Sequence, residues 1–291
     1  MNNEKMTHEE KVELMKRIAH DPEARQAFAA SLSLPLLQRV REETSVRKIF
    51  AEDELPAGAL PRYPVEFYSS EMKALMIPKQ GAEIPMVQVE GDEVTVPTFV
   101  LSAGASFNIF YARDGRYNVR EAVLRTLTDA FVKAEEEEGW KLVRAAIGPN
   151  NTLQIPGETT LSKNLISEMI VYFDKKGYRP DLLVCSVKRA ADIRLWGTEE
   201  LDDSTRREVF RQGGMGSIWG VDILPLRRLA DDEVYMFDTS RFGVMPIRER
   251  LQVFDDPTAI KQLKVGLMAY EELGFAVIDN TAVVKGVIAS S

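Results

Sequence analysis

The sequence predicts an α+β protein organised around one long helix. Three observations support this fold class. Apolar residues recur at helical spacing between Asn118 and Gly148, strand-like sequence forms a long hairpin before that stretch, and helix and strand patterns alternate after it. With 291 residues, 45% of them hydrophobic, the chain is long enough for one large domain or two ordinary ones.

The N-terminal segment, 1–64, is expected to form a helical arm followed by a linker. Capping signals near the start, an Asp-Pro pair at 21–22 and Pro35 each predict the beginning of a short helix, the third ending near Glu43. Prolines and a glycine in 52–64 predict an extended linker. Because these helices share little apolar stripe, two interpretations stay open: an arm that packs on something else, or a small helical cap on the main domain.

Residues 65–113 have the pattern of a long hairpin that leads into the helix. Apolar and polar residues alternate in 84–89 and 94–101, on either side of a turn expected at Gly91-Asp92. Polar positions are about as frequent as apolar ones, and a hairpin of this kind is marginal by itself. It therefore has to lie on another surface, of this subunit or of a neighbour.

The long helix itself is expected within 114–148. Asn118 can cap its start, and Gly148-Pro149 stops it. Gly139 is expected to bend it, and the four glutamates of 135–138 are interpreted as a solvated face rather than a metal site. The apolar stripe consists of Val123, Leu127, Ala130, Phe131 and Ala134.

The second half of the chain predicts a mixed α/β unit and then further strands. Helices are expected at about 161–173 and 187–196, and strands at 181–186, 217–226 and 233–238. Residues 242–291 carry strand patterns with a break at Asp279-Asn280.

Few familiar catalytic or metal sites are compatible with this composition. The only two histidines, His8 and His20, lie at the N-terminus, and the only cysteine, Cys185, lies in an apolar run. Nucleophilic triads need a histidine beside the nucleophile, and most zinc sites need several His or Cys ligands. We therefore expect no catalytic residue, cofactor or metal, although carboxylate- or lysine-based chemistry stays open.

A glycine-rich segment at Gly213–Gly216 has no Lys-Ser/Thr after its last glycine, so it lacks the phosphate-loop pattern. It is interpreted as a flexible loop entering a strand. The acidic pairs elsewhere in the second half are interpreted as solvated charge.

The balance of charged side chains limits which kinds of partner are expected. The formal net charge is −8, from 37 basic and 45 acidic side chains, which argues against a general nucleic-acid binder with a basic face. No apolar run approaches the ~18 residues of a membrane span, and the charged start is no secretory signal. A product made in the cytoplasm, without a membrane partner, is expected.

The C-terminal part carries a resemblance to a known family. The stretches 242–251 (FGVMPIRERL) and 265–279 (VGLMAYEELGFAVID) resemble the closing segment of tailed-bacteriophage major capsid proteins, which have the Hong Kong 97-type fold also found in encapsulins. The order of elements agrees over nearly the whole chain. The resemblance implies the following organisation: N-terminal arm and linker 1–64, extended loop and start of the peripheral domain 65–113, spine helix of the peripheral domain 114–148, axial domain 149–241, and return to peripheral-domain strands 242–291.

This resemblance implies a structural protein rather than an enzyme. The expected partners are further copies of the chain in pentamers and hexamers of an icosahedral shell, a separate scaffolding protein, a portal protein and enclosed double-stranded DNA. The expected location is the virion, with assembly in the host cytoplasm. Two alternatives stay open: an encapsulin-type compartment around an enzyme cargo, and a carboxylate-based α/β enzyme, against which the missing histidines count.

Contacts between subunits are expected in the extended loop and in the glycine-rich segment. A Lys–Asn cross-link from Lys73 or Lys79 to Asn280 is not expected, so the shell is predicted to be non-covalent. The candidate contact residues are Met76, Ile77, Val87, Val89, Val94, Val96, Phe99, Gly213, Gly214 and Gly216.

Overall fold

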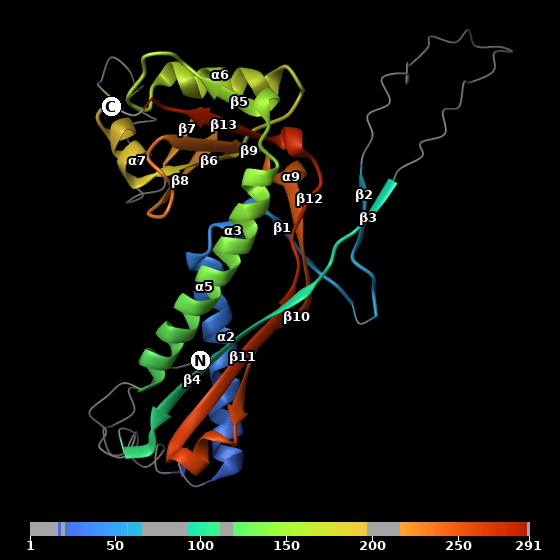
Figure 1. Cartoon of the computed structure of the whole chain (residues 1–291), viewed down its shortest axis with the longest axis vertical. Helices are drawn as coiled ribbons and strands as arrows, with labels where there is room; N and C mark the ends of the chain where they lie inside the picture. The colour runs from blue at the N-terminus through green and yellow to red at the C-terminus, as the bar shows by residue number, and fades with distance from the viewer. Residues whose placement is uncertain are drawn as a thin grey trace, which may run out of the picture.

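Two units joined by a long helix make up the chain (Figure 1). The structure is a computed structural model, and it describes residues 17–18, 21–56, 58–65, 92–110, 119–196 and 216–289. The helix is α5 (Val119–Ala145), which runs from the lower unit in Figure 1 to the upper one. No helix in the described ranges is long and apolar enough to span a bilayer.

The lower unit is built on a five-stranded sheet in the order β1-β10-β11-β4, with β12 also pairing with β10. Strands β10, β11 and β4 are antiparallel, and β1 is parallel to β10. Buried side chains of β10 and β11 share one core cluster with α2 and α5, so the two helices cover one face of this sheet. The elements are α2 (Pro22–Glu43), α3 (Val46–Ile49), β1 (Ala51–Glu54), β4 (Phe99–Asn108), β10 (Gly243–Asp256), η2 (Ala259–Gln262), β11 (Lys264–Leu273) and β12 (Ala276–Val277).

Helix α2 is a single helix of 22 residues, so the prediction of a break at Pro35 is wrong. Asp21 caps its start, because the Asp21 side chain accepts a hydrogen bond from the backbone N–H of Glu23 at 3.0 Å. A proline inside a helix costs about 3 kcal/mol, but here one buried stripe continues on both sides of it and packs on α5 and β10. The helix is thus a cap on the main body of the same chain. The stripe consists of Phe28, Ala29, Leu32, Leu36 and Val40.

The long helix predicted from the apolar periodicity is confirmed over Val119–Ala145. Val123, Leu127 and Phe131 are buried as expected, whereas Ala130 is exposed. Helix α5 continues through Gly139 without interruption, so this residue does not break the helix. Gly139 instead allows α3 to approach closely: a Cβ built there would lie 2.4 Å from Cγ1 of Val46.

We expect Gly139→Ala to destabilise the protein by about 1–2 kcal/mol, although alanine normally stabilises a helix by about 1 kcal/mol relative to glycine. The reason is the overlap with Val46, which is fully buried and cannot move into solvent. Chemical denaturation measures the change. The double variant Gly139→Ala/Val46→Ala should recover part of the loss if the overlap is its cause, and a stabilising single variant would contradict the close approach.

A buried ion cluster lies beside this contact. The guanidinium of Arg47 donates to both carboxylate oxygens of Glu135, at 2.7 and 2.8 Å, and to Oε2 of Glu271 at 2.8 Å. The three side chains are 2%, 0% and 1% exposed. The prediction that 135–138 is a solvated face is therefore wrong for Glu135, which helical periodicity places on the buried side between Phe131 and Gly139.

A two-stranded ribbon projects from the lower unit at the right of Figure 1. It pairs β2 (Arg62–Val65) with β3 (Asp92–Thr95) in antiparallel register. The segment predicted as a linker, 52–64, thus contains most of β2 and part of β1. Asp92 lies in a strand rather than in the expected turn, and the predicted strand 84–89 lies outside the described residues.

The upper unit contains a six-stranded sheet in the order β5-β13-β9-β6-β8-β7. The predicted helix and strand order of this unit is confirmed where it is described. Strand β13 lies between β5 and β9, so the segment 242–291 contributes to both sheets instead of returning only to the lower one. The elements are η1 (Pro149–Asn151), β5 (Thr152–Gln154), α6 (Lys163–Asp174), β6 (Leu182–Ser186), α7 (Val187–Arg194), β7 (Ser217–Ile218), β8 (Val221–Leu226), β9 (Glu233–Phe237), α9 (Thr239–Phe242), η3 (Asn280–Ala282) and β13 (Val283–Val287).

Candidate assembly surfaces

The described residues contain no group of three or more His, Cys, Asp or Glu side chains placed to hold a metal ion. The cysteine is buried in β6, where burial, followed by the charge of Asp192, raises the pKa of the Cys185 thiol to about 12. A thiol with such a pKa is not a nucleophile near neutral pH.

One face of the lower sheet is not covered by helices in the described structure. Leu101, Ala103 and Ala105 of β4 pack towards α2 and α5, so the alternate residues of this strand point to the opposite face. Register places Gly104, Met268 and Phe254 in one row across β4, β11 and β10, and Ser102, Tyr270 and Gln252 in the next. We call the surface formed by Val100, Ser102, Gly104, Phe254, Met268 and Tyr270 the open sheet face.

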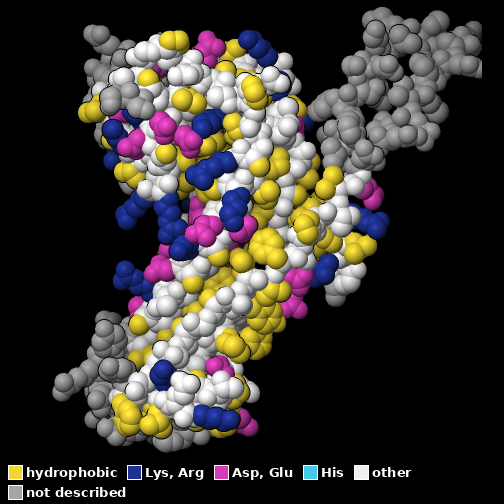
Figure 2. Space-filling model, in the orientation of Figure 1, with side chains coloured by type: hydrophobic (Ala, Val, Ile, Leu, Met, Phe, Trp, Pro, Cys, Tyr) yellow, Lys and Arg dark blue, Asp and Glu magenta, His cyan; other side chains and the backbone are white. Residues whose placement is uncertain are grey.

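Large apolar side chains are exposed on the open sheet face. Val100 is 60% exposed, Met268 48% and Phe254 42%. The ring of Phe254 stacks on that of Tyr270, with centroids 5.4 Å apart and planes at 11°. Beside this stack the strands form a hollow of about 400 Å³, which includes Gly104. Figure 2 shows hydrophobic side chains gathered along the strands of the lower unit.

The projecting ribbon offers a second exposed surface. Val94 of β3 is 43% exposed, whereas Val96, just beyond the strand, is 1% exposed. Val96 packs inside the subunit near Gly274, where an added Cβ would lie 3.3 Å from Cγ1 of Val96. Residues two positions apart in a strand are predicted to point to the same side. Of these two valines, however, only Val94 is exposed.

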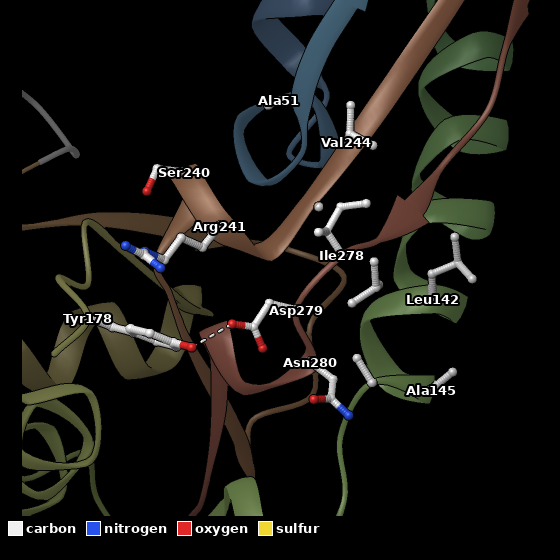
Figure 3. Close-up of a pocket in the computed structure, with 13 residues that line it drawn as sticks. Ala51, Leu142, Ala145, Tyr178, Ser240, Arg241, Val244, Ile278, Asp279 and Asn280 are labelled. Carbon is white, nitrogen blue, oxygen red and sulfur yellow. Dashed lines mark hydrogen bonds between the residues drawn. The ribbon is translucent and has the colours of Figure 1, made fainter. Parts of the chain in front are cut away.

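A hollow of about 1050 Å³ lies where the two units meet (Figure 3). Its walls come from the end of α5, from α9, from the start of β10 and from the chain between β12 and η3. Tyr178 donates a hydrogen bond from its hydroxyl to Oδ2 of Asp279 at 2.8 Å, and the guanidinium carbon of Arg241 lies 5.0 Å from the centre of the Tyr178 ring. These contacts tie the upper unit to the crossing segment.

Comparison with solved structures decides the fold. A chain from Microbacterium phage Oxtober96 is similar over 85% of this chain and 91% of its own length, with a TM-score of 0.62 and 15% identity. A chain from Mycobacterium phage Bobi has the same coverage and TM-score with 16% identity. The capsid chain of a native GTA particle covers the same shares with a TM-score of 0.61 and 15% identity.

The chain has the Hong Kong 97-type capsid fold. No protein-family model matches the sequence, and no curated protein sequence matches it either. At 15–16% identity, the likeness to these structures concerns the fold alone. The described residues contain the predicted long helix followed by an α/β unit. Most of the predicted extended loop, 65–113, lies outside the described residues, and the predicted domain bounds stay predictions.

Within this fold the predicted contact residues are spread over different environments. Val94 is exposed; Phe99 is partly buried, with its ring centre 6.1 Å from that of Phe275; and Gly216 is buried. The backbone carbonyl of Gly216 accepts a hydrogen bond from Ile223 at 2.9 Å. Six of the ten candidates lie outside the described residues, namely Met76, Ile77, Val87, Val89, Gly213 and Gly214.

The open sheet face was missed from the sequence, although one signal for it was present. Val100 and Leu101 are adjacent apolar residues in a strand, and so are Leu267 and Met268, which means that both faces carry apolar side chains there. Asn280 lies at the rim of the hollow between the units, where its backbone carbonyl accepts a hydrogen bond from Nδ2 of Asn151 at 3.0 Å. The lysines Lys73 and Lys79 lie outside the described residues.

Proposed function

We propose that the chain is a major capsid subunit that self-assembles through pentamers and hexamers into a closed icosahedral shell around double-stranded DNA. The observation that carries this proposal is the capsid fold over 85% of the chain, shared with phage and GTA structures. A scaffolding protein and a portal protein are the further partners that the proposal includes.

The open sheet face and the ribbon support this proposal physically. A sheet with one face packed by helices and large apolar side chains on the other gains free energy when a second subunit covers it, because apolar area leaves water. Val100, Met268 and Val94 are such exposed side chains. The ribbon projects from the body, so it can reach beyond the surface of its own subunit (Figure 1).

The formal net charge is consistent with a shell that encloses nucleic acid without binding it tightly. At −8 the subunit is not attracted to phosphates by its net charge, so DNA inside a shell would not be held tightly by the wall. Electron microscopy and light scattering of the purified chain, alone and co-expressed with a scaffolding protein, test assembly. Closed particles are expected; a monomer under both conditions would contradict the proposal.

The contents of purified particles distinguish DNA packaging from cargo storage. Particles made in infected or induced cells are treated with nuclease and then opened. Protected double-stranded DNA is expected under the capsid proposal. A co-purified enzyme without nucleic acid would instead support the encapsulin-type compartment.

Charge placed on the open sheet face should weaken assembly. We expect Val100→Glu and Met268→Glu each to raise the protein concentration needed for particle formation at least about tenfold, because a carboxylate buried between subunits has no partner. Both side chains are about half exposed or more in the subunit, so the subunit fold should persist. Light scattering against concentration gives the threshold, and circular dichroism checks the fold.

Thr126→Glu is the matched control, since it puts the same charge on the exposed side of α5, away from the open sheet face. We expect its assembly threshold to stay within about twofold of the unaltered chain, as for ordinary surface changes. Equal loss of assembly in the control and in the two face variants would argue against a specific contact on this face.

A further inference from the structure

The ion cluster of the lower unit places two fully buried carboxylates against one buried cation. We define the Arg47 cluster as Arg47 of α3, Glu52 of β1, Glu135 of α5 and Glu271 of β11. Glu135 and Glu271 are essentially unexposed, and Glu52 reaches Nη1 of the same guanidinium at 3.4 Å. Two fully buried carboxylates facing one guanidinium leave an excess negative charge if both are ionised.

The hydrogen bonds indicate which carboxyl holds a proton. Both oxygens of Glu135 accept from Arg47, whereas only Oε2 of Glu271 does. The second oxygen, Oε1 of Glu271, is buried and has no hydrogen-bond partner. Burial, followed by the negative charge of Glu135, raises the pKa of Glu271 from an ordinary 4.5 to about 8. Burial would lower the pKa of Arg47, but the hydrogen bond and charge of Glu135 raise it, so the guanidinium stays charged.

In the described part of the chain, Glu135 and Arg47 are the charged groups that act on Glu271. On β4 its register partner is Leu101, and on β10 it lies opposite the irregular pairing between Glu249 and Gln252. Arg250 in that irregular stretch is exposed and is paired with Glu54.

The neighbouring acid on α5 is also engaged elsewhere. Glu136 accepts hydrogen bonds from the backbone N–H and the hydroxyl of Ser45 and from Nε1 of Trp140. The charge at Glu271 is therefore governed by Arg47, Glu135 and the proton.

We propose that the proton on Glu271 locks the 44–54 segment, with α3 and β1, against the long helix, and that loss of this proton loosens the segment. Within the cluster, Arg47 forms the described ion pairs that join α3 to both α5 and β11. Val46 and Ile49 of the same four-residue helix are fully buried beside these pairs, so the segment is held by apolar packing as well as by the ion pairs. With both glutamates ionised, the repulsion between them weakens this link. The inference concerns a single subunit and does not depend on shell formation.

The direction of the pH effect follows from the proton count. Between pH 4.5 and about 8 the closed segment holds a proton on Glu271 that an opened, hydrated carboxyl releases. The closed state therefore loses stability as pH rises through this window, and the loss levels off above it. If opening restores an ordinary pKa, the ratio of closed to open segment falls roughly a hundredfold between about pH 6 and pH 9.5.

Hydrogen–deuterium exchange of the full chain tests the lock. The reporter amides are those of Thr44, Lys48 and Phe50, which donate to Val40, Ser45 and Val46 in the closed segment. After correction for the intrinsic pH dependence of exchange, their protection should fall up to a hundredfold from about pH 6 to pH 9.5. Light scattering confirms that the assembly state is the same at each pH.

Three variants make the test specific. Glu271→Gln keeps the neutral shape, so protection should no longer depend on pH. Glu135→Gln removes the repelling charge, so the loss should move to lower pH. Glu272→Gln, on the opposite face and paired with Arg248 and Thr98, is the matched control and should behave like the unaltered chain. Protection that does not change with pH, or a Glu271→Gln variant with unaltered pH dependence, would overturn the proposal.

Discussion

Arg47→Ala is expected to cost about 3–5 kcal/mol of unfolding free energy, among the largest effects of any single substitution in this chain. The change leaves Glu135 and Glu271 buried without their cation, at exposures of 0% and 1%. It also removes the connection between α3, α5 and β11. Denaturant unfolding near neutral pH, followed by far-ultraviolet circular dichroism, measures the loss.

Arg41→Ala is the matched control for this substitution. Arg41 also pairs with Glu52, at 2.6 Å, but its side chain is 40% exposed. Exposed ion pairs contribute about 0–1 kcal/mol, so a small change is expected. A triple variant that replaces Arg47, Glu135 and Glu271 by Met, Leu and Leu should recover most of the stability, since a packed apolar cluster removes the unpaired charges. Equal, small effects of Arg47→Ala and Arg41→Ala would show that the buried cluster contributes little.

Phe242→Ala is expected to destabilise the chain by about 3–5 kcal/mol, because it opens a cavity in the core where the two units meet. Phe242 is fully buried at the end of α9. Its ring centre lies 5.2 Å from that of Phe50 and 5.1 Å from that of Phe237, so it contacts residues that flank both sheets. Denaturant unfolding followed by both circular dichroism and tryptophan fluorescence gives the loss and tests whether the units still unfold together.

Phe254→Ala provides the comparison, since Phe254 is 42% exposed and its ring stacks on that of Tyr270. We expect about 1 kcal/mol or less for the isolated subunit. Its main effect should appear in particle formation, because it removes a large side chain from the open sheet face. A loss of subunit stability as large as that of Phe242→Ala would mean that the open sheet face belongs to the internal core.

The parts of the fold that the sequence predicted well have local signals. The long helix combines a stripe through Val123, Leu127 and Phe131 with a glycine-proline stop, so its length could be predicted within a few residues. The buried strand Leu182–Ser186 is a short apolar run, which is typical of a strand inside a sheet.

The parts that it predicted wrongly depend on partners far along the chain. The stripe of α2 continues across Pro35 and is buried in one core cluster with residues of α5 and β10. Glu135 is inside because Arg47 reaches it from 88 residues away. Helical periodicity places Glu135 on the same side as Phe131 and Gly139, but no local pattern in the run of four glutamates shows that a buried cation lies opposite it.

The candidate surface was only partly predictable for a similar reason. Val94 was identified by alternation and is exposed, whereas Val96 has the same alternation and is buried against the segment around Gly274. The row of Gly104, Met268 and Phe254 joins three strands separated widely in sequence. Its apolar character could be predicted from the residues, but their adjacency required the register.

The strand pairing has a consequence for synthesis on the ribosome. Ala51 of β1 pairs with Val244, Phe99 of β4 pairs with Leu273, and β5 pairs with β13 near Lys285. At about 5–20 residues per second, the early strands therefore wait for roughly 10 s or more before their partners are made. Until these strands have been translated, a nascent chain lacks the complete row of Gly104, Met268 and Phe254. Other nascent chains on the same messenger RNA therefore do not encounter a complete open sheet face. Late closure of both sheets thus delays association until translation of the pairing strands is over.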